Sequence, residues 1–176
     1  MKGQLHVQNQ STRKHLYRRT ELQRIAERVC KGEGVVEEVE ISLLLCDDPL
    51  IQELNQTYRK KNAPTDVLSF PQEDPGLAGV VVLGDIVISL ETVERQCASE
   101  RPAMAAEVRL LFCHGLLHLL GHDHATREDE RRMQEKQAEY LGVDVQAAWR
   151  QHRKQASGQA AEGARGKRKV TLGRGQ

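Results

Sequence analysis

The stretch HGLLHLLGHDH, residues 114–124, closes a long apolar run and places four histidines within eleven positions. Residues four apart on a helix lie on one face, so His114 and His118 can direct their imidazole rings at one point. Gly121 follows where a left-handed residue can end the helix and turn the chain back. That turn can return the side chain of His124 to the same point. The stretch therefore predicts a metal site, held by these three histidines, at the end of a long central helix.

Three neutral histidines suit zinc and leave the fourth position of a tetrahedral ion open, as in catalytic zinc sites. The spacing HxxxHxxGxxH is that of the metzincin proteases, in which three histidines hold the ion. Those proteases carry a glutamate directly after the first histidine as general base, whereas this chain has Gly115. The missing carboxylate disfavours a peptidase, and a buried glutamate close to the metal would restore that reading.

The competing interpretation is that these are core histidines satisfied by hydrogen bonds, which is usual for a single histidine on an apolar face. Three histidines at ligand spacing around a helix-ending glycine argue against it. His122 and Asp123 leave two readings open. Each can orient a metal ligand from behind by a hydrogen bond, or simply occupy the turn.

Hydrophobic periodicity outward from this stretch predicts alternating strands and helices. A helix is expected over about 102–120, and a charged one over about 127–141 with Thr126 as its N-cap. Asp48 is expected to cap a helix that Pro49 opens. Strands are expected at 5–10, 36–46, 67–70 and 83–89, and further helices at about 16–31, 49–59 and 89–99. The pattern indicates an α+β domain with one small mixed sheet packed against helices.

Composition limits the class of protein. The chain has 176 residues, of which 39% are hydrophobic and 29% charged, which suits one well-buried domain. Its start, MKGQLHVQNQ, is too polar for a secretory signal, and no apolar run is long enough to cross a bilayer. We therefore expect a cytosolic protein without a membrane partner. Its four cysteines form no CxxC pair, which favours buried reduced thiols: Cys30, Cys46, Cys97 and Cys113.

The end of the chain differs from the rest. Residues 150–176 contain eight Lys or Arg residues and one acidic residue, Glu162, so residues 1–149 carry a net charge of −6. This tail lacks hydrophobic periodicity and is rich in Gly, Lys and Arg. We expect one domain over 1–149 and a disordered basic arm over 150–176. The arm either contacts RNA phosphates without sequence preference or merely aids solubility.

Three stretches together resemble the YbeY family of metal-dependent endoribonucleases, bacterial factors for ribosomal RNA maturation. HGLLHLLGHDH is similar to the metal motif of that family. YRKKNAPTDVLSFP at 58–71 resembles its substrate-pocket segment, and LGDIVIS at 83–89 resembles its central strand. The resemblance extends over about residues 4–145. The position of His122 is often Tyr in the family.

The resemblance implies that one Zn²⁺ per chain is bound by His114, His118 and His124. It also implies that Arg59 serves the RNA and that the sheet is mostly parallel with one antiparallel strand. Arg59 and His114 are the catalytic candidates, since an arginine can hold phosphate oxygens bidentately while zinc supplies an activated water. The alternative for Arg59 is a solvated helix end, and Lys60 and Lys61 beside it can extend a positive strip along RNA.

The activity implied is hydrolysis of phosphodiester bonds in single-stranded RNA, for maturation of the 3′ end of 16S rRNA and for ribosome quality control. The ribosome or its small-subunit proteins are the implied partners. One rival function is a metallopeptidase-like hydrolase. The other is a non-catalytic ribosome assembly factor that binds RNA and keeps a structural zinc with a closed fourth ligand, for instance His122.

Two further polar residues lie in predicted strands. Asp85 interrupts an apolar strand, where an unpaired carboxylate is costly, so it needs a partner. A structural pairing is the favoured reading, and orientation of a histidine ligand is the alternative. Ser69 can hydrogen-bond a substrate, but without an adjacent base it is not expected to act as a nucleophile.

Overall fold

The structure is a computed structural model that describes residues 3–72 and 80–146. The predicted basic arm at 150–176 lies outside these described residues. The elements in chain order are β1 (Gly3–Asn9), α1 (Arg19–Gly32), β2 (Glu38–Cys46), α2 (Asp48–Arg59), β3 (Val67–Pro71), β4 (Val80–Ser89), α3 (Leu90–Gln96), α4 (Arg101–Leu119) and α5 (Arg127–Leu141).

The four strands form one sheet in the order β1-β2-β4-β3. β2 pairs in parallel with both β1 and β4, and β3 pairs antiparallel to β4 at the edge. The α+β class and the mostly parallel sheet with one antiparallel strand are therefore confirmed. Helix α1 makes the crossover between the parallel strands β1 and β2, as such a connection requires.

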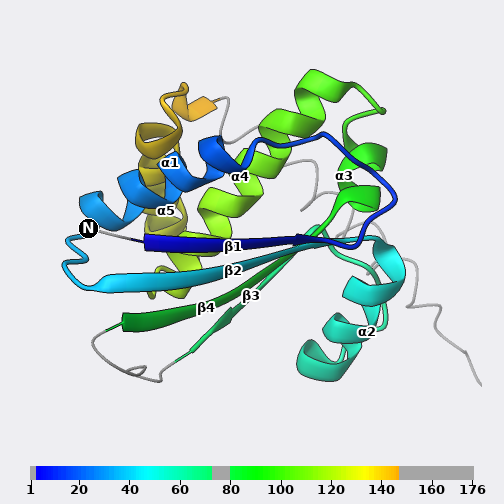
Figure 1. The fold of residues 1–176 in the computed structure, drawn as a ribbon, viewed down its shortest axis with the longest axis horizontal. Helices are drawn as coiled ribbons and strands as arrows, with labels where there is room; N and C mark the ends of the chain where they lie inside the picture. Colours follow the sequence, from blue (N-terminus) through cyan, green and yellow to red (C-terminus); the bar gives the residue numbers. More distant parts are fainter. Residues whose placement is uncertain (1–2, 73–79, 147–176) are drawn as a thin grey trace, which may run out of the picture.

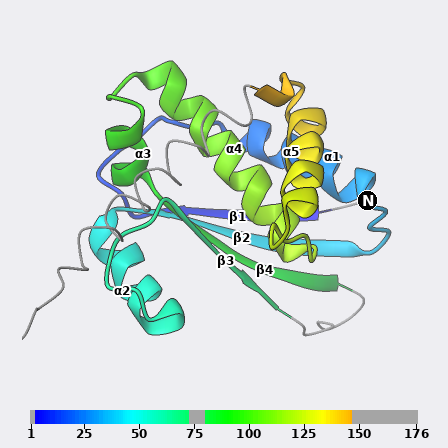
Figure 2. The ribbon, with the colours of Figure 1, turned by 180° about the vertical axis from the view of Figure 1, so that it is seen from behind.

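Figures 1 and 2 show α1, α4 and α5 over one face of the sheet, with α2 on the other side. Burial alternates along β2, where Val39, Ile41, Leu43 and Leu45 are buried in the main core. A smaller apolar cluster lies beneath α2 and includes Ile51 of that helix. The two faces thus carry separate cores, and the larger one supports α4.

Helix α4 is apolar around most of its circumference, which is typical of a helix buried on several sides. Its residues from Leu110 to Leu117 are all buried. It packs against α1, α3, α5, β3 and β4. The histidines at its end are therefore held by the most completely enclosed helix in the described part of the chain.

The predicted cap of α2 is wrong in detail. Asp47, not Asp48, is the N-cap residue, and Asp48 is the first residue of the helix. The Asp48 carboxylate instead accepts hydrogen bonds from Ser89 Oγ and Thr92 Oγ1, each at 2.6 Å, which ties α2 to α3. Pro49 is tolerated one position later than expected, because backbone N–H groups throughout the first turn lack helical partners.

Two other helix ends follow local chemistry. Thr126 caps α5 as predicted, and it forms a reciprocal capping box with Asp129. Helix α3 ends at Gln96, earlier than the predicted 99, because Ala98 and Ser99 have φ angles of 49° and 61°, which are left-handed. These two residues turn the chain sharply into α4.

None of the four cysteines forms a disulfide, as predicted, although Cys97 is only partly buried. Cys113 lies in the main core. It is not part of the cluster of three histidines, although His114 is the next residue in the chain. Among the described helices, none combines the length and apolarity that crossing a membrane demands.

Candidate metal centre

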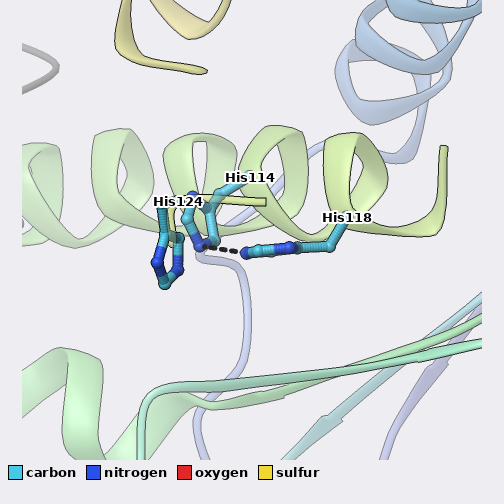
Figure 3. Close-up of side chains that lie close together, drawn as sticks. All are labelled: His114, His118 and His124. Atoms are coloured by element: carbon cyan, nitrogen blue, oxygen red, sulfur yellow. Dashed lines mark hydrogen bonds between the residues drawn. The ribbon is translucent and has the colours of Figure 1, made fainter. Parts of the chain in front are cut away.

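The structure brings the three predicted ligands together at the end of α4 (Figure 3). His114 Nε2 and His118 Nε2 are 3.0 Å apart, one helical turn from each other. The His124 ring lies 5.7 Å from the His114 ring and 5.0 Å from the His118 ring, between centroids. One ligand nitrogen from each histidine lies within 4.8 Å of the others, so the group can hold a metal ion.

The return of His124 depends on the turn at Gly121, whose φ is +88°. Gly121 N donates to His118 O, and His122 N donates to Leu117 O. This pair of bonds is a Schellman motif, in which a left-handed residue satisfies the last carbonyls of a helix. The turn reverses the chain, and three residues beyond Gly121 the His124 ring faces the two helical histidines.

A cavity of about 650 Å³ opens at the three histidines. Its other walls come from the end of α2, the segment leading into β3, and α5. Arg59, the last residue of α2, is exposed and lines this cavity. Thr65, Asp66 and Ser69 line it from the side of β3. Residues from the end of α2 to β3 thus share one cavity with the three histidines.

The electrostatics of the site favour a neutral His118. Burial lowers the pKa of His118, and its electrostatic interactions with His124 and Arg59 lower it further. A neutral imidazole keeps a lone pair for a metal, whereas an imidazolium has none. Arg59 lines the same cavity as the three histidines.

His122 and Asp123 have separate positions. His122 Nε2 lies 2.8 Å from Glu33 Oε2, away from the three ligands, so His122 does not close a fourth coordination position. Asp123 lines the cavity, and its Oδ1 accepts a hydrogen bond from His124 N at 2.7 Å. Within the part of the chain that is described, the group of possible metal ligands contains only the three histidines.

Asp85 does not orient a histidine ligand. Its Oδ2 accepts a hydrogen bond from Gln72 Nε2 at 3.1 Å, and it lines a second cavity of about 750 Å³ on the α2 side of the sheet. Residues alternate between faces along a strand, so Asp85 shares that side with Val87, whereas Ile86 faces the main core. The structural interpretation of Asp85 therefore agrees with its position.

Close packing against the sheet explains why a glycine follows the first histidine. A Cβ atom at Gly115 would lie 2.9 Å from Ile86 Cγ2 and 2.9 Å from Ser69 Oγ. Helix α4 thus approaches β3 and β4 so closely at this point that no side chain fits without movement. The side chains of Ile86 and Ser69 on the sheet therefore fill the space that a glutamate at residue 115 would need.

Glu107 is the buried glutamate on α4, and burial together with the negative charge of Asp66 raises its pKa to about 7. It precedes His114 by seven residues, about 10 Å along the helix axis. It is not among the residues that line the histidine cavity. Glu107 therefore does not replace the missing base of a peptidase.

Sequence reasoning missed Gln137. Its Oε1 lies 2.8 Å from His114 Nδ1, and its side chain is only 1% exposed. Met133, Gln137 and Tyr140 lie at helical spacing on the buried face of α5. A polar residue at the centre of an apolar helix face is the signal that could have identified it.

Glu33 anchors the turn that carries His124. At the end of α1, its carboxylate contacts His122 Nε2 at 2.8 Å, Lys136 Nζ at 2.6 Å and the hydroxyl of Tyr140. Burial raises the pKa of Glu33, but the bonds from Lys136, Tyr140 and His122 outweigh it and lower the pKa to about 2. This cluster links α1, α5 and the turn.

We expect the Glu33 cluster to make stability depend on pH. A carboxyl with a folded pKa of about 2 and an ordinary value of 4.5 stabilises the fold above pH 4.5. That contribution, about 3 kcal/mol, is lost as pH falls from 4.5 towards 2. Chemical denaturation across this range should show a smaller decline for Glu33→Gln than for the parent. Glu53→Gln, at an exposed position outside the cluster, is the matched control, and an unchanged decline for Glu33→Gln would contradict the prediction.

Comparison with known proteins identifies relatives over most of the chain. The family model described as Endoribonuclease YbeY matches residues 6–143. The Endoribonuclease YbeY of Pelotomaculum thermopropionicum is 47% identical over 125 residues, covering 69% of this chain and 82% of that protein. That of Oceanobacillus iheyensis is 40% identical over 129 residues, covering 69% and 84%. The solution structure of a Thermotoga maritima protein matches with a TM-score of 0.50 and 27% identity, covering 86% of this chain and 93% of that one.

Proposed function

The chain belongs to the Endoribonuclease YbeY family, and from this premise we propose that it is a zinc-dependent endoribonuclease of the cytoplasm. It hydrolyses phosphodiester bonds in single-stranded RNA, chiefly in precursors of the 3′ end of 16S rRNA, and takes part in ribosome quality control. The observation that carries the proposal is the cluster of His114, His118 and His124 in one cavity with the Arg59 guanidinium.

The residues of the cavity divide the chemistry between them. His114, His118 and His124 would hold one zinc ion and leave one position open, because no fourth ligand from the described residues joins them. A zinc ion bound there supplies a Lewis acid and lowers the pKa of a coordinated water. Arg59 binds the phosphate oxygens and stabilises the charge that develops on them in the transition state.

The packing at Gly115 and the partner of His122 disfavour the two rival functions. A peptidase of this spacing needs a carboxylate beside the metal, and the close packing at Gly115 excludes one there. A structural zinc would need a fourth ligand, and the histidine named for that role, His122, contacts Glu33 instead. Both observations favour an open, catalytic metal site over the two rival functions.

The proposal is tested by metal analysis of the purified protein together with cleavage of single-stranded RNA before and after chelation. We expect about one zinc per chain and cleavage that stops on chelation and returns when zinc is added. Zinc without cleavage would support a structural site and overturn the enzymatic proposal. Cleavage that survives complete removal of metal would overturn the role of zinc.

Arg59→Lys is expected to lower the single-turnover rate of RNA cleavage by roughly 10- to 100-fold, because lysine keeps the charge but loses the planar two-pronged donor. Zinc content and melting temperature should not change, since Arg59 is exposed at a helix end. The same substitution at Arg24, which is exposed on α1, is the control. A parent-like rate in both Arg59→Lys and Arg59→Glu would remove Arg59 from the catalytic machinery.

A further inference from the structure

The two ring nitrogens of His114 have different neighbours. Nε2 faces His118 at 3.0 Å on the side of the possible metal, and Nδ1 lies 2.8 Å from Gln137 Oε1. A neutral imidazole carries its proton on one nitrogen and a lone pair on the other. His114 can therefore bind a metal through Nε2 only when the proton is on Nδ1.

The amide of Gln137 selects that state. A carbonyl oxygen only accepts hydrogen bonds, so Oε1 at this distance requires a proton on Nδ1. The opposite orientation of the amide would turn its nitrogen, a donor, towards Nδ1 and would move the histidine proton to Nε2. That arrangement would block the lone pair that a metal needs.

The surroundings of Gln137 bury its amide. The residue is 1% exposed and lies on the face of α5 that packs against α4. Within the described structure its Nε2 is buried without a hydrogen-bond partner, which is costly. The side chain of Gln137 therefore serves only the hydrogen bond between Oε1 and His114 Nδ1. A side chain that only stabilised the core at this position would be apolar.

We propose that Gln137 is a positioning residue for the metal centre, which fixes the tautomer and ring orientation of His114 through its carbonyl oxygen. The inference rests on the proposed metal-binding role of His114. Hydrogen-bond partners behind a ligating histidine typically change metal affinity by 10- to 100-fold when they are removed. The role belongs to Oε1 alone, so any side chain with an acceptor oxygen at the same place performs it.

The experiment measures zinc affinity by competition with a chromophoric chelator and the His114 tautomer by ¹⁵N NMR of the metal-free protein. Gln137→Met keeps the volume and removes the acceptor, and should weaken zinc binding by roughly 10- to 100-fold. It should also move His114 towards the tautomer with its proton on Nε2. Gln137→Glu keeps the acceptor and should bind zinc at least as tightly as the parent. Gln56→Met, at an exposed position on α2 outside the histidine cavity, should leave both the zinc affinity and the His114 tautomer unchanged.

Thermal melts identify variants that fail to fold, and Gln137→Asn then replaces Gln137→Met. Its shorter side chain keeps the amide but withdraws the oxygen from His114, so the same loss of affinity is expected. Parent-like zinc affinity and tautomer in Gln137→Met or Gln137→Asn would overturn the inference, and so would an equal loss in Gln137→Glu. A parent protein that binds no zinc would instead contradict the proposed function.

Discussion

His118→Ala is expected to weaken zinc binding by at least roughly two orders of magnitude, because it removes one of only three coordinating nitrogens. The fold should persist, because His118 is only partly buried and its ring faces the other two histidines. Elemental analysis and chelator competition measure the zinc, and circular dichroism measures the fold.

His122→Ala is the matched control for this loss, since His122 lies on the same turn but contacts Glu33. His122→Ala loosens the turn but removes no ligand, so it should weaken zinc binding far less than His124→Ala does. Undiminished zinc in a folded His118→Ala protein would remove His118 from the ligand set. Zinc retained without His124 but lost without His122 would exchange the roles of those two residues.

Gly115→Glu is expected to unfold the domain or to destabilise it by more than about 4 kcal/mol, although it creates the HExxH pattern of a zinc peptidase. The new side chain would have to displace Ile86 and Ser69 and would bury a carboxylate without a partner. Gly115→Ala, which adds only a Cβ atom, should cost about 1–3 kcal/mol. Urea denaturation measures both.

Peptide hydrolysis is the companion measurement for Gly115→Glu. The packing at this position predicts no gain of peptidase activity, because the helix cannot keep its place on the sheet with the larger side chain. A Gly115→Glu protein with the melting temperature of the parent would show that α4 does not need this close contact. New zinc-dependent cleavage of peptides in that protein would restore the peptidase reading of the motif.

Most of the fold was predictable because its signals are local. The alternation along β2 and the helical spacing in α1 bury the residues that the periodicity indicated. Helix α5 begins and ends where predicted, since Thr126 and Asp129 form a cap from neighbouring residues. The sequence placed the N-cap of α2 at Asp48, one residue too late. The Asp48 side chain bonds to the start of α3, about forty residues later, and not to its own helix.

The approach of the three histidines was predictable for a similar reason. Helical spacing places His114 and His118 on one face, and Gly121 supplies the left-handed residue that a Schellman turn requires. The direction of His122 was not predictable, because its partner Glu33 lies 89 residues earlier. The reading of Gly115 as a missing base was incomplete, because the side chains that exclude a larger residue belong to β3 and β4.

The sequence by itself determined the elements of this protein, the composition of the candidate metal centre and the end of the helix that carries it. These depend on hydrogen bonds and side-chain spacing within one or two turns of the chain. Only the tertiary structure decided that Gln137 faces His114 Nδ1, that Arg59 reaches the histidine cavity, and that Asp85 lies on the other side of the sheet. These contacts join segments distant in the chain, and they exist because burial of the apolar faces of α4, α5 and the sheet brings those segments together.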